Sequence, residues 1–188
     1  MCKLILLGGV PGVGKTTIAY ELARTYKIDK VLSIDVLKNV IKRFISKEDE
    51  PYLYTTTHEA YTLDNLEIVD GYKRHSKILN KYVIDILESF KNEKIIILEG
   101  ATINQDILNY LKEFDVYYFN LYLKDESDLI KRYESKLKIR KGKWIENIDK
   151  INEINDYLIN QKVININAKD KKETLKEIRR YLDEDIYN

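Results

Sequence analysis

Residues 9–16 read Gly-Val-Pro-Gly-Val-Gly-Lys-Thr, which satisfies the pattern G-x-x-x-x-G-K-[ST] of a phosphate-binding loop. Glycines let the backbone curve so that its N–H groups converge on a phosphate, and the following helix presents the positive end of its dipole. We expect Lys15 to reach the β- and γ-phosphates of a nucleotide and the Thr16 hydroxyl to ligate Mg²⁺. The alternative is a glycine-rich turn that carries Lys-Thr by chance. The expected contacts with ATP come from Gly9, Val10, Pro11, Gly12, Val13, Gly14, Lys15, Thr16 and Thr17.

Two carboxylates stand directly after predicted buried strands. Asp35 follows the strand predicted at 31–34, and Glu99 follows the strand predicted at 94–98. Ligands of an open parallel sheet lie at the carboxyl ends of its strands, so we expect both side chains to face the nucleotide. Asp35 is predicted to accept the proton of an attacking hydroxyl or to help hold Mg²⁺, and Glu99 to assist the metal through water. Gly100 is a position where a ligand could approach this strand end closely.

Both carboxylates also have structural interpretations. Asp35 could be the N-cap of the helix predicted from residue 36, a role that is compatible with catalysis. Glu99 could be a solvated strand end. The four apolar residues before it and the glycine after it favour a functional role instead.

Three hydroxyl side chains mark a candidate site for the acceptor. Thr55, Thr56 and Thr57 stand at a predicted helix start, where hydroxyl and N–H groups could hold a substrate phosphate. From the residues alone, an ordinary capping box made by Thr56 and Glu59 explains this segment better.

Lys38 and the two histidines are weaker candidates. Lys38 lies on the helix predicted after Asp35 and could meet an anionic acceptor, although surface solvation explains it nearly as well. His58 and His75 are predicted to be surface or half-buried polar residues rather than catalysts.

A basic segment over about 132–144 is predicted to act as a lid. Arg132, Lys136 and Arg140 precede Trp144 in this segment. Arginines on a closing segment neutralise the charge that develops during phosphoryl transfer. For any one of these residues a solvated basic face is the alternative, and we expect Arg132 or Arg140 to close over the phosphates.

Short apolar runs typical of buried strands alternate with segments whose apolar residues recur every three or four positions. This alternation is typical of a parallel sheet with helices on both faces, so we expect one three-layer α/β domain over residues 1–188. The predicted strands are 3–7, 31–34, 94–98, 116–123 and 163–166. The predicted helices are 16–25, 36–45, 66–90 (one helix, or two that meet near Gly71), 127–137, 145–159 and 171–182.

Composition excludes several classes of protein. The 188 residues are 44% hydrophobic and 34% charged, as in soluble globular domains. A net charge of +1 provides no basic field for nucleic acid or an anionic membrane. One cysteine and two histidines exclude an internal disulfide framework and Cys- or His-rich metal sites. The apolar start is too short for a signal peptide or a membrane span, so a cytosolic location is expected.

The chain resembles the archaeal 2-phosphoglycerate kinase family of P-loop kinases over about residues 3–167. Six family segments have counterparts here in the same order: GGxxGxGKST at 8–17, TDxIR at 34–38, LHTSSYEA at 53–60, GFxxQ at 71–75, EGVH at 99–102 and IxDYL at 154–158. The resemblance implies a P-loop kinase fold related to the nucleoside monophosphate kinases. It also implies that ATP phosphorylates 2-phosphoglycerate to 2,3-diphosphoglycerate, and that Thr55, Thr56 and Thr57 line the acceptor pocket.

The chain departs from the family pattern at four positions. An arginine of the family is Lys38 here, a glutamine is His75, a histidine is Thr102, and a second arginine is Asn152. Lysine supplies only a point charge, whereas arginine binds phosphate in a bidentate manner. These changes cluster in the half of the chain predicted to bind the acceptor.

The residues and the resemblance together predict a cytosolic kinase that uses ATP and Mg²⁺ and acts on a small phosphorylated metabolite, with 2-phosphoglycerate as the first candidate. Two alternatives stay open. One is a kinase of the same fold whose acceptor is a nucleotide, a nucleoside or an RNA terminus, and the near-neutral charge disfavours RNA. The other is a nucleotide-dependent switch or binding module that reports to a protein partner.

Overall fold

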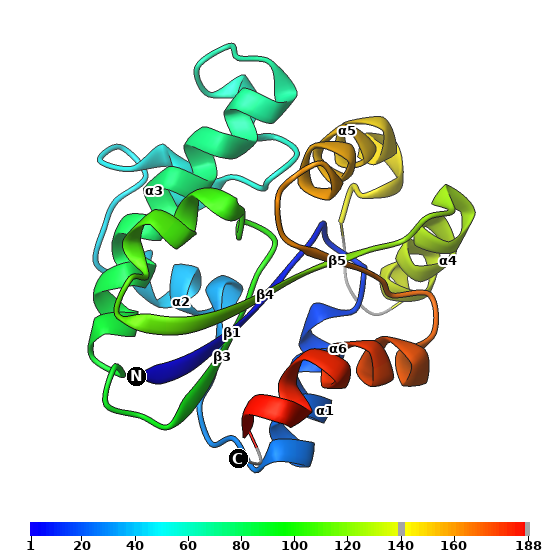
Figure 1. Cartoon of the computed structure of the whole chain (residues 1–188). Helices are drawn as coiled ribbons and strands as arrows, with labels where there is room; N and C mark the ends of the chain where they lie inside the picture. The colour runs from blue at the N-terminus through cyan, green and yellow to red at the C-terminus, as the bar shows by residue number, and fades with distance from the viewer. Residues whose placement is uncertain (139–141, 187–188) are drawn as a thin grey trace.

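Five parallel strands form the centre of the protein. The computed structural model describes residues 1–138 and 142–186, and there the strands run in the order β2-β3-β1-β4-β5 (Figure 1). Every pairing between these strands is parallel, which confirms the predicted sheet. The strands are β1 (Cys2–Gly8), β2 (Val31–Ser33), β3 (Ile95–Glu99), β4 (Phe114–Tyr122) and β5 (Ile164–Asn167).

Helices connect the strands and cover both faces of the sheet, as the alternating pattern predicts. Each predicted helix is present, with ends that differ by a few residues. The α-helices are α1 (Lys15–Tyr26), α2 (Ile34–Ile41), α3 (Ile68–Glu88), α4 (Glu126–Leu137), α5 (Ile148–Ile159) and α6 (Lys171–Ile186). The short 3-10 segments are η1 (Pro51–Tyr54), η2 (Ala60–Thr62), η3 (Gln105–Tyr110) and η4 (Ile145–Asn147).

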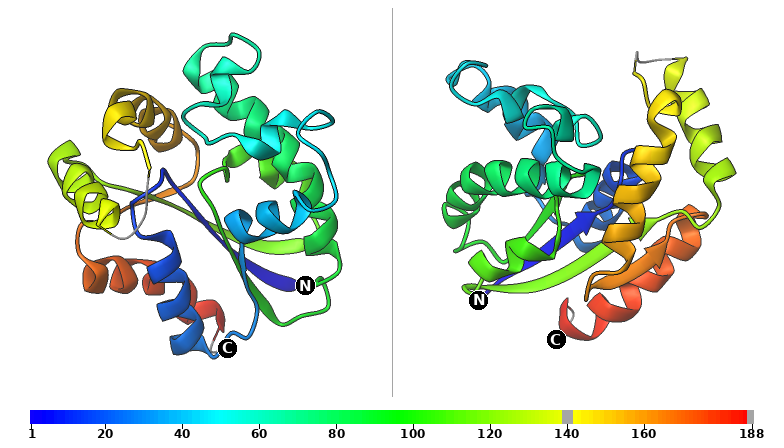
Figure 2. Two further views of the ribbon diagram at one scale, coloured as in Figure 1. Left: turned by 180° about the vertical axis from the view of Figure 1, so that it is seen from behind. Right: turned by 90° about the horizontal axis from the view of Figure 1, so that it is seen from above.

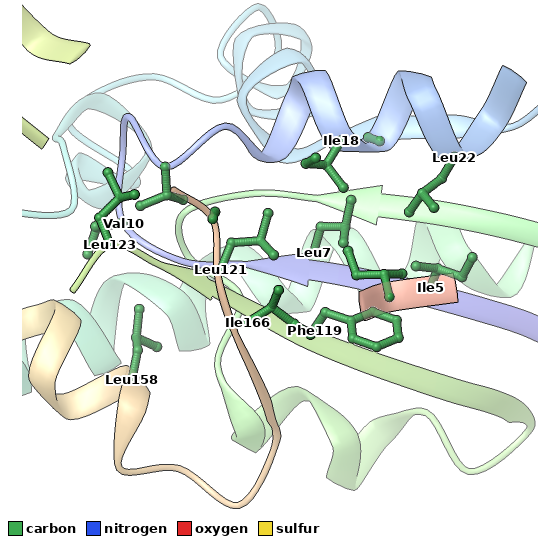
Figure 3. Packing of buried hydrophobic residues seen from close by; sticks show 14 of the residues in the cluster. Ile5, Leu7, Val10, Ile18, Leu22, Phe119, Leu121, Leu123, Leu158 and Ile166 are labelled. Carbon is green, nitrogen blue, oxygen red and sulfur yellow. The ribbon is translucent and has the colours of Figure 1, made fainter. Parts of the chain in front are cut away.

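Helices α1 and α6 pack on one face of the sheet. Successive side chains of a strand point to opposite faces, and Ile5 and Leu7 of β1 point to this face. Figure 3 shows Ile18 and Leu22 of α1 beside them. Each of these side chains is almost completely buried, so this contact fixes α1 directly behind the strand that leads into the phosphate loop.

Helix α3 lies across the sheet from α1 and α6 (Figure 2). Leu4 and Leu6 of β1 point to this second face and share a buried cluster with Leu79, Val83 and Leu87 of α3. These α3 residues recur every four positions, which places them on one side of the helix. The side chains of β1 therefore belong to two buried clusters, one on each face of the sheet.

The register of the central strands brings three strand ends to one edge of the sheet. Leu7 of β1 pairs with Glu99 of β3, and Glu99 pairs in turn with Ser33 of β2. Because the strands are parallel, the segments that follow them all leave from this edge. The phosphate loop, the start of α2 and Glu99 are thus neighbours, as the sequence predicts.

The structure decides two points that the sequence left open. Helix α2 begins at Ile34 with Ser33 as its N-cap, so Asp35 lies in the first turn and is not the N-cap. Helix α3 runs unbroken through Gly71. A Cβ atom there would lie 2.3 Å from the Cα of Tyr61, so this glycine allows the segment before α3 to pack closely against the helix rather than breaking it.

No helix in the described parts of the chain has both the length and the apolar composition needed to cross a membrane.

Candidate active site

Helix α1 begins at the phosphate loop with its N-terminus open. Its N-cap is Gly14, and in the described structure no side chain caps this end and no acidic residue lies in its first turn. The first N–H groups of a helix have no partner within the helix, and the dipole makes this end positive. The loop therefore fits the phosphate group of a nucleotide.

Lys15 lies folded into this loop. Its Nζ donates hydrogen bonds to the carbonyl oxygens of Gly9 and Val10, at 2.8 and 2.9 Å. Burial lowers the pKa of Lys15 to about 8, and the carboxylates of Glu99 and Asp35 partly oppose this shift. A buried ammonium group with two carboxylates nearby supplies the positive charge that a transferring phosphoryl group requires.

Thr16 and Glu99 meet beside the loop. The Thr16 hydroxyl donates to Oε1 of Glu99 at 3.1 Å, and Glu99 is buried. A hydroxyl and a carboxylate are oxygen ligands of the type that Mg²⁺ prefers. No group of three or more His, Cys, Asp or Glu side chains in the described residues could hold a metal alone. The site therefore fits a Mg²⁺ ion whose other ligands are phosphate and water oxygens.

A cleft of about 910 Å³ begins at this loop and extends to α2, α3 and the segment before η2. Of the predicted site residues, Asp35, Lys38 and Glu99 line it, as do Thr56 and Thr57. The loop contributes Pro11, Gly12, Val13, Gly14, Lys15, Thr16 and Thr17. One connected cavity thus contains both the predicted nucleotide contacts and most of the predicted acceptor contacts.

Four other predicted site residues lie elsewhere. Gly9 and Val10 do not line the cleft, and they contribute the carbonyl groups that hold Lys15. Thr55 also lies outside, and its carbonyl accepts a hydrogen bond from Lys38 Nζ at 3.0 Å. Gly100 is covered by Ile34, whose Cβ would lie 2.7 Å from a Cβ added to the glycine, so this glycine serves packing rather than a ligand's approach.

The threonine segment differs from the predicted capping box. Thr56 Oγ1 donates to the side chain of Glu59 at 2.8 Å, while the backbone N–H of Glu59 donates to the carbonyl of Thr56. The segment forms turns, and the 3-10 helix η2 begins only at Ala60. The predicted cap is therefore absent from this part of the described chain, and Thr56 and Thr57 face the cleft instead.

Arg132 lies on α4 beside the phosphate loop. Its guanidinium donates to the carbonyl of Val13 at 2.8 Å and to that of Ala168 at 2.6 Å. The next residue, Tyr133, donates to the carbonyl of Pro11 at 2.7 Å. Arg132 is thus held against the wall of the cleft, and its predicted part in catalysis stays a prediction. Arg140 lies outside the described residues.

Sequence reasoning missed three buried polar side chains in the cleft. His58, His75 and Thr102 line it and are 3%, 0% and 4% exposed, so the prediction of surface or half-buried histidines is wrong. The helical spacing of Tyr72, His75 and Leu79 on one side of α3 was a signal for burial. Lys136 and Trp144 of the predicted lid segment also line the cleft. Other lining residues carried no motif: Lys131, Ser135, Ala168, Lys171 and Thr174.

Acid is expected to destabilise the protein through His75. Burial, together with the positive charges of Lys38 and Lys42, lowers the pKa of His75 to about 3, while an unfolded histidine has a pKa near 6.5. Between these two pKa values His75 binds a proton in the unfolded state but not in the folded state, so the unfolding free energy falls as the pH falls. From pH 6.5 to 4.5 the wild type should lose about 2 kcal/mol more unfolding free energy than His75→Gln.

Urea unfolding of both proteins at the two pH values measures this difference. Tyr52 also lies near the ring, at 6.3 Å between centroids, and burial raises its pKa to about 12, so it does not titrate in this range. An equal loss of stability in the two proteins would show that His75 is not held neutral.

Comparison with protein families gives one match to most of the chain. The family described as an AAA domain matches residues 5–153. This range contains the phosphate loop, both strand-end carboxylates and the threonine segment.

Archaeal 2-phosphoglycerate kinases are among the curated relatives. The enzyme of Methanococcus maripaludis strain C6 is 31% identical over 172 residues, which cover 83% of this chain and 55% of the relative. That of Pyrococcus horikoshii is 31% identical over 165 residues, covering 83% and 54%. These matches confirm the resemblance seen in the motifs. The chain spans about half the length of the curated relatives it matches.

Solved structures with the same fold include two small-molecule kinases. A shikimate kinase from Bacteroides thetaiotaomicron has a TM-score of 0.58 and 16% identity, covering 96% of this chain and 98% of the other. A gluconokinase from Sinorhizobium meliloti has a TM-score of 0.56 and 11% identity, covering 99% and 95%. At these identities the likeness concerns the fold alone, and it confirms the P-loop kinase fold.

Proposed function

We propose that this chain, which belongs to the AAA domain family, is a kinase that transfers the γ-phosphoryl group of ATP to a hydroxyl group of 2-phosphoglycerate. One observation carries the proposal. A single cleft contains the phosphate loop and, beyond it, a cation and hydroxyl groups suited to a second anionic molecule. The names of the curated relatives support 2-phosphoglycerate as this molecule and 2,3-diphosphoglycerate as the product.

The phosphate loop binds and orients the donor in this proposal. The N–H groups at the start of α1 hold the phosphates, and Lys15 leaves its two carbonyl partners to bind the transferring group. Thr16 and Glu99 would hold Mg²⁺, and the bound ion would neutralise charge on the phosphates. Arg132 and Tyr133 of α4 keep the loop in place by donating hydrogen bonds to its carbonyl groups.

Asp35 and Lys38 serve the acceptor side. Asp35 is exposed to the cleft from the first turn of α2, where it can accept the proton of the attacking hydroxyl. The hydroxyl oxygen then bonds to the γ-phosphorus, the bond to the β-phosphate oxygen breaks, and ADP leaves. Lys38, one turn further along α2, together with Thr56 and Thr57, binds the phosphate that the acceptor already carries.

A panel of acceptors tests the proposal. Labelled ATP is incubated with the protein and 2-phosphoglycerate, a nucleoside, a nucleoside monophosphate, an RNA with a free 5′-hydroxyl, or no acceptor. We expect label to pass to 2-phosphoglycerate and not to the others. Transfer only to a nucleotide or RNA would contradict the proposed acceptor. Nucleotide binding with slow hydrolysis that no acceptor stimulates would contradict the kinase activity and favour a switch or binding module.

A further inference from the structure

Two buried polar side chains that line the cleft have no hydrogen-bond partner among the described residues. Neither ring nitrogen of His75 has a hydrogen-bond partner among the described residues, and the same holds for Oγ1 of Thr102. Both side chains line the cleft and are almost completely buried. Leaving buried donors unpaired costs free energy, so a group that pairs them on binding gains affinity.

Two tyrosines hold the segments that carry these groups together. Tyr72 of α3 and Tyr118 of β4 both donate to the carbonyl of Ile103, at 3.2 and 2.8 Å. His75 follows Tyr72 by almost one turn of the helix, and Thr102 directly precedes Ile103. The two residues are therefore placed by the same junction between α3 and the segment after β3, and both line the cleft.

The chemistry of the two groups limits what they can bind. Burial and the charges of Lys38 and Lys42 keep His75 neutral, so its ring donates one hydrogen bond and carries no charge. The Thr102 hydroxyl donates a second hydrogen bond. Two neutral donors match the two oxygens of a carboxylate, whereas a dianionic phosphate requires more donors and positive charge. Lys38, which also lines this cleft and whose charge lowers the pKa of His75, carries that positive charge.

We propose that His75 and Thr102 bind the carboxylate of the acceptor. This inference rests on the proposed function and divides the acceptor site into two parts. Lys38, Thr56 and Thr57 bind the phosphate, and the junction of α3 with the segment after β3 binds the carboxylate. The acceptor class is then a phosphorylated hydroxy acid rather than a phosphorylated alcohol.

Three small molecules test the assignment by calorimetry in the presence of a non-hydrolysable ATP analogue. They are 2-phosphoglycerate; glycerol 2-phosphate, which has a hydroxymethyl group in place of the carboxylate; and glycerate, which has no phosphate. Both His75→Ala and Thr102→Val should weaken the binding of 2-phosphoglycerate about tenfold or more, because each removes a hydrogen bond to a charged group. Both should leave the binding of glycerol 2-phosphate nearly unchanged.

Two further variants separate binding from folding. His75→Gln keeps a neutral N–H donor and should lose less affinity than His75→Ala. Ser76→Ala removes a buried hydroxyl next to His75 that does not line the cleft, and it should bind all three molecules as the wild type does. Thr102→Val replaces the hydroxyl with a methyl group and removes the proposed donor, so it tests the site even if His75→Ala does not fold.

Several outcomes would overturn the inference. Equal weakening of 2-phosphoglycerate and glycerol 2-phosphate would assign these residues to the phosphate or to folding, and unchanged affinities would leave them without a binding role. If either result is found while label still passes to 2-phosphoglycerate, the carboxylate assignment is wrong and the proposed function stands. If the variants weaken only the binding of 2-phosphoglycerate but no label is transferred, the proposed function is wrong and the carboxylate assignment stands.

Discussion

Lys15→Met is expected to lower the rate of phosphoryl transfer about a thousandfold or more. Lys15 Nζ already lies inside the phosphate loop, within 3 Å of the carbonyl oxygens of Gly9 and Val10. Methionine fills a similar volume without a charge, so the charge that develops on the transferred group is no longer neutralised. Single-turnover transfer of label from ATP to saturating 2-phosphoglycerate measures the effect.

The same variant should keep or gain stability. Burial lowers the pKa of Lys15 to about 8 from an unfolded value near 10.5, so the charged side chain destabilises the folded state at pH 7. Its removal should raise the unfolding free energy by up to about 3 kcal/mol. The unfolded state binds the Lys15 proton more tightly than the folded state does. The wild type should therefore gain unfolding free energy between pH 8 and 10.5, and Lys15→Met should lack this gain.

Lys172→Met is the matched control, since it removes one charge from an exposed position on α6. It should keep wild-type activity and stability. Wild-type transfer by Lys15→Met would refute the proposed role of the lysine. Loss of activity together with a large loss of stability would assign Lys15 to the fold instead.

Gly9→Ala is expected to destabilise the protein by more than about 3 kcal/mol. Gly9 has a φ of 121°, and a Cβ there would lie 2.1 Å from the carbonyl oxygen of Leu121. Leu121 is buried in β4 and pairs with Ile166 of β5, so its backbone has no room to move. Urea unfolding of the variant and the wild type measures the loss.

Gly14→Ala separates backbone strain from steric overlap. Gly14 also has a positive φ, 101°, but the nearest described atom to its added Cβ is Nη1 of Arg132, at an ordinary contact distance of 3.4 Å. Strain alone should cost about 1–2 kcal/mol. Equal losses in the two variants would show that overlap with Leu121 is not what requires a glycine at position 9.

Local patterns were sufficient to predict the secondary structure and the donor site. The apolar run before Gly8 predicted β1, and the glycines with Lys15 and Thr16 predicted the loop and the helix after it. Both strand-end carboxylates lie near the loop because parallel strands leave their following segments at one edge. The strand, the loop and the helix after it depend on residues close together in the chain, and the general rule for parallel sheets was enough to predict that the carboxylates lie near them.

The acceptor side was decided by tertiary structure. His75 is buried because α3 packs against the sheet, and Thr102 faces the same cleft because Tyr72 and Tyr118 bind the carbonyl beside it. No local pattern shows that these groups lack partners, because that depends on contacts between segments far apart in the chain. Gly100 is a second case that local sequence could not predict. Its sequence context suggested access for a ligand, but Ile34, which is far away in the chain, covers it. The sequence thus determined the loop that is predicted to bind phosphate, whereas long-range packing decided which other polar groups line the cleft.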